Sequence, residues 1–310
     1  MPEHARSRQP DPEDDREPAP GGRRAVRLPV ASPHEADARY WDEVADSVAR
    51  ARPDPLWRHY SDRVNGALLR AWLPDHGGTL LKTDLFDEAW TGGFLWDPEQ
   101  DGSQRAGAAV GIDTSPVVAA RALARHPGAP AVGADVRHLP FRDASFRAVI
   151  SPSTLDHFAD RSEIFVALRE IHRILAPGSH VVVTLDNPLH PLVALRGLGL
   201  GLWRRLGLIP YRLGVTLRPA ELAAALEAAG FEVLRRGAVQ HFPRIALIAL
   251  DRLIGRRVRA RSWLLRRAVA QERLGRFSTK YLTGQFIAVL ARRPVRPSEG
   301  SSPDSQAPPG

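Results

Sequence analysis

The chain has 310 residues, of which 43% are hydrophobic, and its formal net charge is +8 at pH 7. This length allows one large domain or two small ones with a substantial core. The absence of cysteine excludes disulfides, thiolate metal ligands and a cysteine nucleophile, and it agrees with a reducing compartment. Nearly all the basic residues are arginine, a bias typical of genome composition, so we expect no nucleic-acid partner.

Both ends of the chain are polar and rich in proline. Residues 1–34 contain the run PEHARSRQPDPEDDREPAPGG, and residues 293–310 end in SEGSSPDSQAPPG. Such segments lack the apolar surface that would offset the entropy of ordering, so we expect two disordered tails around a folded domain at 35–292. No apolar segment follows the first methionine, which argues against a secretory signal and favours a cytoplasmic protein.

Residues 35–75 place apolar and aromatic side chains at helical spacing, with a break at Pro53 and Pro55. They predict two helices before the first strand. These helices either pack on the sheet or cover a small-molecule pocket with polar and aromatic side chains, namely Trp57, His59, Tyr60 and Asn65.

Strand and helix patterns alternate along the following residues. Predicted strands cover 79–86, the run that ends at Asp113, 131–134, 146–151, 180–185 and, antiparallel, 285–290; predicted helices cover 117–126 and 163–175. This alternation predicts an α/β fold with a doubly wound parallel sheet. Asp113 and Asp135 each follow a short apolar run. We therefore expect both carboxylates at the carboxyl edge of the sheet, where open α/β sheets bind ligands.

Four sequence motifs occur in a familiar order. They are GIDTSP at 111–116, LPFRDASFRAVIS at 139–151, REIHRILAPGSHVVVT at 169–184 and RPAELAAALEAAGFEV at 218–233. The chain resembles the class I S-adenosylmethionine-dependent methyltransferases, of the methyltransferase type 11-like kind, closely over 79–187 and more loosely over 216–291. The resemblance implies a Rossmann-like doubly wound seven-stranded sheet, here with N-terminal helices and helical insertions.

The same resemblance implies S-adenosylmethionine as cofactor and assigns roles to six residues. Asp113, with Thr114 beside it, would accept hydrogen bonds from the ribose hydroxyls. Asp135 would accept from the adenine amino group, with Val136 beside the ring, and Ser151 and Pro152 would line the methionine end and the methyl-transfer path. From the residues alone, Asp113 and Asp135 are also compatible with helix capping or turn formation.

The first strand departs from the family pattern. The family has an acidic residue there, followed by glycines at alternate positions, whereas this chain reads KTDLFDE from Lys82 to Glu88. Two explanations remain open: Asp84 or Asp87 takes the amino group of the cofactor's methionine part, or cofactor binding is lost. We expect Lys82 to pair with a nearby acid. The missing glycine turn also argues against a nicotinamide or flavin dinucleotide.

Methyl transfer needs few catalytic groups, because the methyl carbon is already activated by a sulfonium. The candidate base is His157, with Asp156 beside it to orient or charge the imidazole. A structural role for His157 remains an alternative. No metal-binding motif occurs, so we predict no metal site.

Two insertions, 189–215 and 242–275, are apolar with interspersed arginines. They could form a lid over a hydrophobic acceptor, which we favour, or lie peripherally on an anionic membrane. The predicted function is methyl transfer to a small, hydrophobic acceptor such as a lipid, a quinone precursor or a specialised metabolite. The alternative is a catalytically inactive binding or partner domain. The sequence assigns neither the acceptor nor the oligomeric state.

Overall fold

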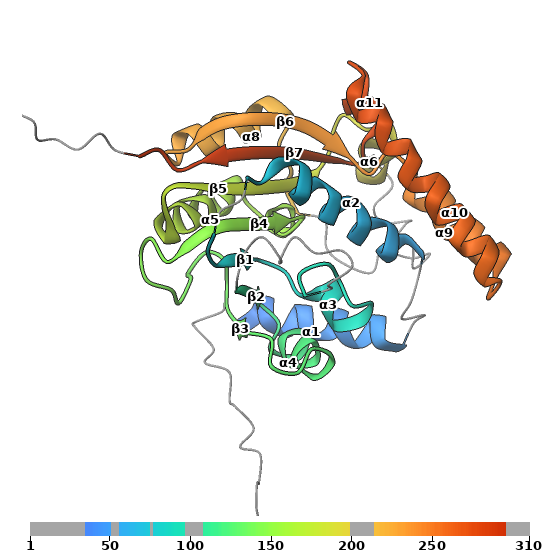
Figure 1. The fold of residues 1–310 in the computed structure, drawn as a ribbon, viewed down its shortest axis with the longest axis horizontal. Helices are drawn as coiled ribbons and strands as arrows, with labels where there is room; N and C mark the ends of the chain where they lie inside the picture. Colours follow the sequence, from blue (N-terminus) through green and yellow to red (C-terminus); the bar gives the residue numbers. More distant parts are fainter. Residues whose placement is uncertain (1–34, 51–55, 75–76, 97–107, 199–213, 296–310) are drawn as a thin grey trace, which may run out of the picture.

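A computed structural model of the chain describes residues 35–50, 56–74, 77–96, 108–198 and 214–295. These residues form a seven-stranded sheet with the order β3-β2-β1-β4-β5-β7-β6 (Figure 1). The strands are β1 Leu80–Lys82, β2 Ala109–Asp113, β3 Ala131–Gly133, β4 Phe146–Pro152, β5 Leu175–Asp186, β6 Glu232–Val239 and β7 Phe286–Arg292.

The first five strands pair in parallel, and β7 lies antiparallel between β5 and β6. The predicted antiparallel last strand is confirmed, and the doubly wound α/β sheet agrees with the expected fold class. Parallel strands bring their carboxyl ends to one edge. Asp113 at the end of β2 and Asp135 just after β3 therefore share the edge predicted to bind a ligand.

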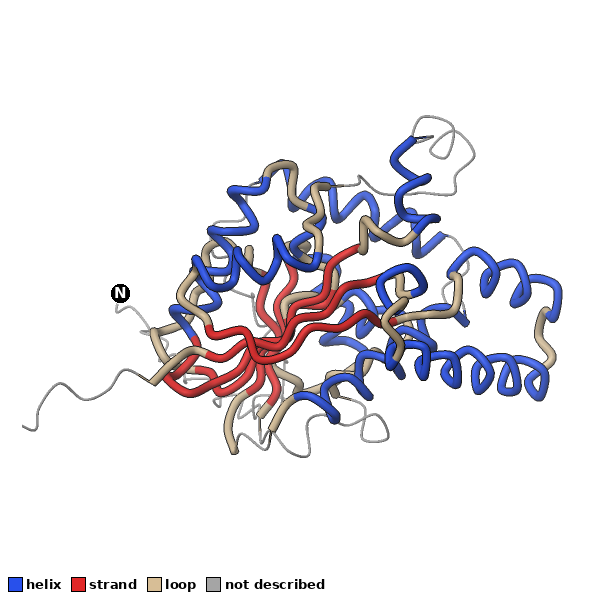
Figure 2. Tube along the Cα trace, turned by 90° about the horizontal axis from the view of Figure 1, so that it is seen from above, coloured by secondary structure: helices blue, strands red, loops and turns tan. Residues whose placement is uncertain are grey.

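Helices cover both faces of the sheet (Figure 2). One core contains buried residues of α2, α3, α4 and α10, and the other contains those of α5 and α8. Neighbouring strand residues point to opposite cores, as Leu80 and Leu81 do in β1. The helices are α1 Glu35–Arg50, α2 Leu56–Trp72, α3 Phe86–Trp90, α4 Pro116–Arg125, α5 Arg161–Ile174, α6 Pro191–Leu198, α8 Pro219–Ala228, α9 Arg244–Ile254, α10 Val258–Ala270 and α11 Lys280–Thr283, with short 3-10 turns η2 Leu155–His157 and η3 Gln271–Arg276.

The first strand is shorter than predicted. The expected strand 79–86 ends at Lys82, and Phe86 already begins α3. The reason is local: the Asp84 carboxylate accepts a hydrogen bond from the Phe86 backbone N–H at 3.0 Å, a turn that starts the helix. The stretch that replaces the family's glycine loop is therefore a turn followed by a single helical turn.

Of the two insertions, the structure describes the first only in part, and the lid over an acceptor stays a prediction. Of the first, the structure describes α6 and residues 214–215, whereas 199–213 lie outside the described residues. The second forms α9, α10 and η3; α9 and α10 make a hairpin that packs against α2 and projects beyond the sheet (Figures 1 and 2). Among the described helices, none combines the length and the apolar character needed to cross a bilayer.

Arg293, one residue past the expected end of the domain at 292, makes contacts with the domain. The Arg293 guanidinium donates hydrogen bonds to the carbonyls of His172 at 2.9 Å and Arg173 at 3.1 Å. Its backbone N–H also donates to Ser179 O at 2.8 Å. These contacts attach the chain to the end of α5 and the start of β5.

A close contact between β2 and the turn after β1 gives a first test. A Cβ added to Gly111 would lie 2.2 Å from Cδ2 of the fully buried Leu85. We expect Gly111→Ala to lower the free energy of unfolding by about 1–3 kcal/mol through overpacking. Urea unfolding of both proteins measures this difference in the free energy of unfolding.

Gly133→Ala is the matched control, because a Cβ added to this β3 glycine meets nothing within 4 Å. It should change the free energy of unfolding by less than about 1 kcal/mol. Adding Leu85→Ala to Gly111→Ala should make the two costs less than additive. Equal effects at both glycines would contradict the packing between Leu85 and Gly111.

Candidate active site

A cavity of about 330 Å³ lies at the carboxyl edge of β1 to β4, at the small end of the range for ligand pockets. The strand ends form its floor, and side chains of α1 and α2 line the opposite side. Both N-terminal helices therefore contribute to the pocket, and α2 also supplies core residues. Of the residues proposed to cover it, Trp57 and Asn65 line the cavity, Tyr60 is fully buried in the core, and His59 lies at a separate surface hollow.

Asp113 lies where β2 ends and faces this cavity. Its carboxylate accepts hydrogen bonds from the backbone N–H of Ser115 at 2.8 Å and of Leu85 at 3.1 Å. A carboxylate has about four acceptor positions, so two remain for a ligand. Burial, and then the charge of Asp84, raises the pKa of Asp113 to about 8. The turn-forming role and the ligand-binding role are thus compatible in one side chain.

Asp135 also faces the cavity, but it is already paired with Arg137. The Arg137 guanidinium donates from Nε to both carboxylate oxygens at 3.0 and 2.9 Å, and from Nη2 at 2.6 Å. The same guanidinium contacts Asp37 of α1 at 2.8 Å and pairs with Glu163 of α5. Arg137 therefore competes with any adenine amino group for the Asp135 carboxylate.

Lys82 is fully buried at the end of β1 and pairs with Glu88 of α3 at 2.5 Å. The expected pairing with a nearby acid is confirmed. The second Glu88 oxygen accepts from the backbone N–H of Phe94 at 3.3 Å and of Leu95 at 3.1 Å. Burial alone would lower the pKa of Lys82, but Glu88, Asp84 and Asp87 together outweigh burial and raise it. The ion pair thus stabilises the loop after α3 and does not enter the cavity.

Carboxylates outnumber cations where β1 meets the cavity. Asp84 and Asp87 line it beside Asp113, and Arg58 pairs with Asp87. Loss of hydration raises the pKa of Asp84 to about 6, opposed by Lys82 and reinforced by Asp87. Within the described residues, no salt bridge joins Asp84 or Asp113 to a cation. This end of the cavity is therefore suited to a positively charged ligand.

The other predicted cofactor contacts divide into two groups. Thr114 and Val136 line the cavity, whereas Ser151 does not: it is fully buried and accepts a hydrogen bond from Thr83 Oγ1 at 3.0 Å. Pro152, the other residue expected at the methionine end, does line the cavity, because successive residues of β4 point to opposite faces. Ser151 supports Thr83, whose hydroxyl also lies 2.8 Å from Thr154 Oγ1.

The two residues of the predicted catalytic pair have different surroundings, although the charge of His157 acts on Asp156. His157 lines the cavity, and its ring packs edge-on against Trp41 of α1 with centroids 4.8 Å apart. Asp156 is buried, and its carboxylate accepts from Ser153 Oγ at 2.9 Å and from Asp186 N at 2.6 Å. Burial and the charge of Asp186 raise the pKa of Asp156. Asp156 thus connects the loop after β4 to β5, and His157 remains the candidate base.

The cavity continues beyond the cofactor residues to an end that the sequence did not reveal. Trp57, Ser61 and Asn65 of α2 line it together with Gln240, Arg244 and Phe286. The Gln240 side chain is 3% exposed, and its Nε2 donates to Ser61 Oγ at 3.0 Å. Within the described residues, its Oε1 has no hydrogen-bond partner. Gln240 also has a φ of +60°, a strained conformation typical of functional sites.

Part of the chain resembles known methyltransferases. Residues 98–183 match a family model described as "Methyltransferase domain". A 61-residue segment is 36% identical to "Probable tRNA methyltransferase 9B" of Mus musculus and of Homo sapiens; it covers 20% of this chain and only 14% and 13% of those relatives. The chain thus spans a small part of the curated relatives that it matches.

Two solved structures share the fold over most of the chain. The [4+2]-cyclase SpnF is 22% identical with a TM-score of 0.51, covering 86% of this chain and 98% of that one. A chain of the complex that contains the Haloferax volcanii Trm112 methyltransferase activator is 18% identical with a TM-score of 0.50, covering 84% and 98%. The match over residues 98–183 and the strand order of the sheet support the Rossmann-like fold of the class I S-adenosylmethionine-dependent methyltransferases, the class that uses S-adenosylmethionine as cofactor.

The buried pair of Lys82 and Glu88 gives a second test. Lys82→Met leaves the Glu88 carboxylate buried without its cation, so we expect the free energy of unfolding to fall by about 3–5 kcal/mol. Adding Glu88→Gln removes the charge, while the amide oxygen can still accept from Phe94 and Leu95. The double variant should therefore recover most of the loss in urea unfolding. If it is no more stable than Lys82→Met, the cost does not come from an uncompensated charge.

Proposed function

We propose that the chain binds S-adenosylmethionine in the cavity and transfers its methyl group to a small acceptor held between α2, α9 and the start of β7. The observation that carries the proposal is the excess of carboxylates at the β1 to β2 edge. Asp84 and Asp113 lose hydration there without a cation in a salt bridge, and both pKa values rise. A cationic ligand with hydroxyl and amino donors satisfies these acceptors.

The residues present fit this cofactor in a modified form. Asp113 offers two acceptor positions to the ribose hydroxyls, and Asp84 can accept from the amino group of the methionine part. Ala134 and Val136 supply an apolar surface for the adenine ring. Asp84 and Phe86 stand at two of the family's glycine positions and line the cavity, so the ligand would contact side chains there and not backbone. Asp135 contributes to adenine binding only if its carboxylate accepts from the adenine amino group and from Arg137 at the same time.

Bound S-adenosylmethionine supplies a methyl group activated by a positive sulfonium. The contribution of the protein is alignment, exclusion of water and, for an acidic acceptor, a base. Thr83, Pro152 and Thr154 line the cavity between the cofactor residues and the α2 side, where an acceptor atom would approach. His157 is positioned to take a proton, since it lines the same cavity.

The acceptor end combines aromatic surface with a few polar groups. Trp57 and Phe286 provide apolar faces, and the Arg244 guanidinium stacks over Trp57 at 5.3 Å. The unpaired Gln240 Oε1 would accept a hydrogen bond from a hydroxyl or N–H group of the acceptor. These side chains support a small, partly apolar acceptor with one hydrogen-bond donor, such as a lipid, quinone precursor or specialised metabolite.

The competing function is a catalytically inactive binding or partner domain that keeps the fold. Isothermal calorimetry with S-adenosylhomocysteine separates the two. Binding that is weakened at least about tenfold by Asp113→Ala supports the enzyme. The absence of binding at millimolar ligand would overturn it.

Cofactor affinity should depend on pH through Asp113. Its pKa of about 8 means that the folded protein keeps this proton below that pH, whereas the ribose hydroxyls prefer the ionised carboxylate. The dissociation constant of S-adenosylhomocysteine should therefore fall as pH rises from 6 toward 8, by about tenfold per unit at most, and level off above 8. Calorimetry at several pH values measures it, and Asp113→Asn should remove this dependence. An unchanged pH profile in Asp113→Asn would assign it to another group.

Gln240 gives a test of acceptor recognition. Gln240→Gly relieves the positive φ, so stability should change by less than about 1 kcal/mol, while methyl transfer should fall about ten- to hundredfold. The assay counts label transferred from methyl-labelled S-adenosylmethionine into a lipid extract of the source cells. Gln240→Asn keeps an amide and tolerates this backbone, so it should retain partial activity. S-adenosylhomocysteine affinity should be unchanged in both variants; a parallel loss of that affinity would contradict a role at the acceptor end.

A further inference from the structure

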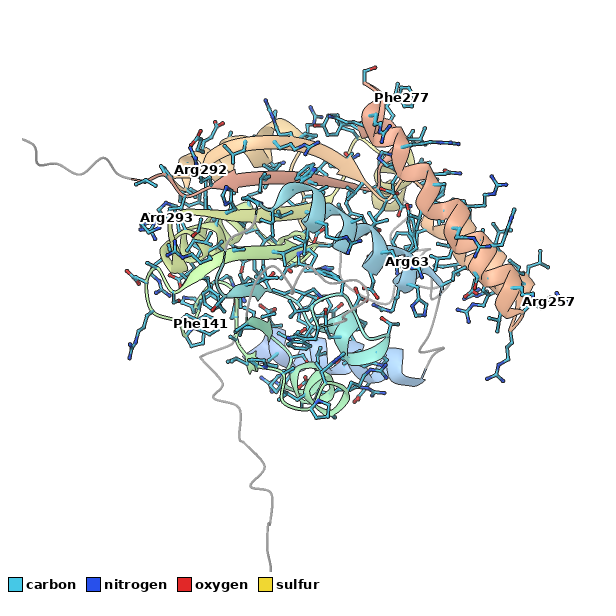
Figure 3. All side chains as sticks on the ribbon, viewed as in Figure 1. Arg63, Phe141, Arg257, Phe277, Arg292 and Arg293 are labelled. Carbon is cyan, nitrogen blue, oxygen red and sulfur yellow. The ribbon has the colours of Figure 1, made fainter. Side chains whose placement is uncertain are left out.

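The α9–α10 arm, defined as residues 244–276, has a clear inner and outer face. Its buried residues Leu247, Leu264, Leu265 and Ala268 join the core beside α2. Ile248, Ile254 and Val269 pack against the same core, whereas many of the other side chains of α9 and α10 are exposed. Figure 3 shows Arg257 at the far tip of the arm and Phe277 next to its other end. The arm thus presents a long outer surface that the rest of the domain does not cover.

Large apolar side chains are exposed on this outer surface. Leu253 is 78% exposed, Val258 75%, Ile245 64% and Trp263 53%. Ile245 and Leu253 are eight residues apart on α9, so they lie on the same side of the helix. Leu253 and Val258 flank the turn between the two helices. Exposed apolar groups gathered in this way indicate an interaction surface.

The arm carries a strong excess of positive charge. It contains ten arginines and two acidic residues, a formal charge of +8 that equals the charge of the whole chain. The acids do not face outward: Asp251 is buried and paired with Arg261, and Glu272 accepts hydrogen bonds from Tyr60, Gln240 and His241. The exposed charges of the arm are therefore all positive, namely Arg252, Arg256, Arg257, Arg259, Arg266, Arg267, Arg273 and Arg276.

We propose that the arm docks on an anionic lipid bilayer surface. Arginines complement the negative headgroups, and the exposed Leu253, Val258, Ile245 and Trp263 enter the boundary between headgroups and acyl chains. Positive charge alone would equally suit a nucleic acid. The apolar residues around the tip decide between them, because a bilayer buries them and a phosphate backbone does not.

Docking there connects the bilayer to the cavity. Arg244, the first residue of α9, lines the acceptor end, and the helix runs from there to the tip. A membrane-bound arm would bring the acceptor end close to the lipid surface. The docking itself does not rest on methyl transfer, because the arm and the cofactor residues are separate.

Vesicle sedimentation tests the docking with the full chain. Vesicles of phosphatidylcholine with about one-third phosphatidylglycerol should bind the protein, and pure phosphatidylcholine vesicles should bind it at least about tenfold more weakly. Raised salt should weaken binding to the anionic vesicles. Arg256→Gln/Arg257→Gln and Leu253→Ser/Val258→Ser should each lower the partition coefficient at least about tenfold.

The matched control is Arg125→Gln/Arg142→Gln, which removes two exposed arginines outside the arm. It should sediment with anionic vesicles like the unchanged protein. Equal losses in the control would assign binding to net charge and overturn the arm as the site. Retention of a mixed tRNA pool in a gel shift, without vesicle sedimentation, would overturn the lipid surface in favour of RNA. Circular dichroism and S-adenosylhomocysteine calorimetry on each variant separate loss of fold or of cofactor binding from loss of docking.

Discussion

The buried ion pair between Lys82 and Glu88 determines the shape of the candidate site. It fixes the end of β1 to α3, and through Glu88 it fixes the loop that contains Phe94 and Leu95. Gly93 passes so close that an added Cβ would lie 2.4 Å from the Glu88 carboxyl carbon. A loop of glycines lets a ligand approach the backbone, whereas here a rigid turn presents side chains. Cofactor binding at this edge therefore depends on carboxylate side chains, whereas in the family pattern it depends on backbone groups.

This replacement gives the two predicted carboxylates different roles. Asp135 is neutralised by Arg137, which also reaches Asp37 and so ties α1 over the edge of β3. Asp113 has only backbone donors from Leu85 and Ser115, so its charge remains to be balanced by a ligand. Removing a carboxylate from water without a cation favours its protonated form. A ligand that binds the ionised Asp113 must therefore offset the cost of removing this proton, which lowers its affinity below the pKa of about 8.

The sequence predicted the fold and the position of the edge, because hydrophobic periodicity and strand ends are local properties. It did not predict contacts between distant segments. Arg137 meets Asp37 across one hundred residues, and Gln240 meets Ser61 across 179. Strand alternation could have shown that Ser151 and Pro152 point to opposite faces. Nothing in the sequence indicated the strained backbone of Gln240, because glutamine does not favour a positive φ.

The two ends of the cavity differ in chemistry, and the arm begins at one of them. Carboxylates gather at the β1 to β3 end, whereas aromatic rings, the Gln240 amide and Arg244 gather where α2 meets α9. A cationic cofactor and a partly apolar acceptor therefore prefer opposite ends and meet near Thr83 and Pro152. Helix α9 begins at the acceptor end of the cavity. The exposed leucine and arginines at its tip therefore continue the apolar and basic character of that end away from the domain. An apolar acceptor would then meet matching surfaces from the bilayer to the cavity.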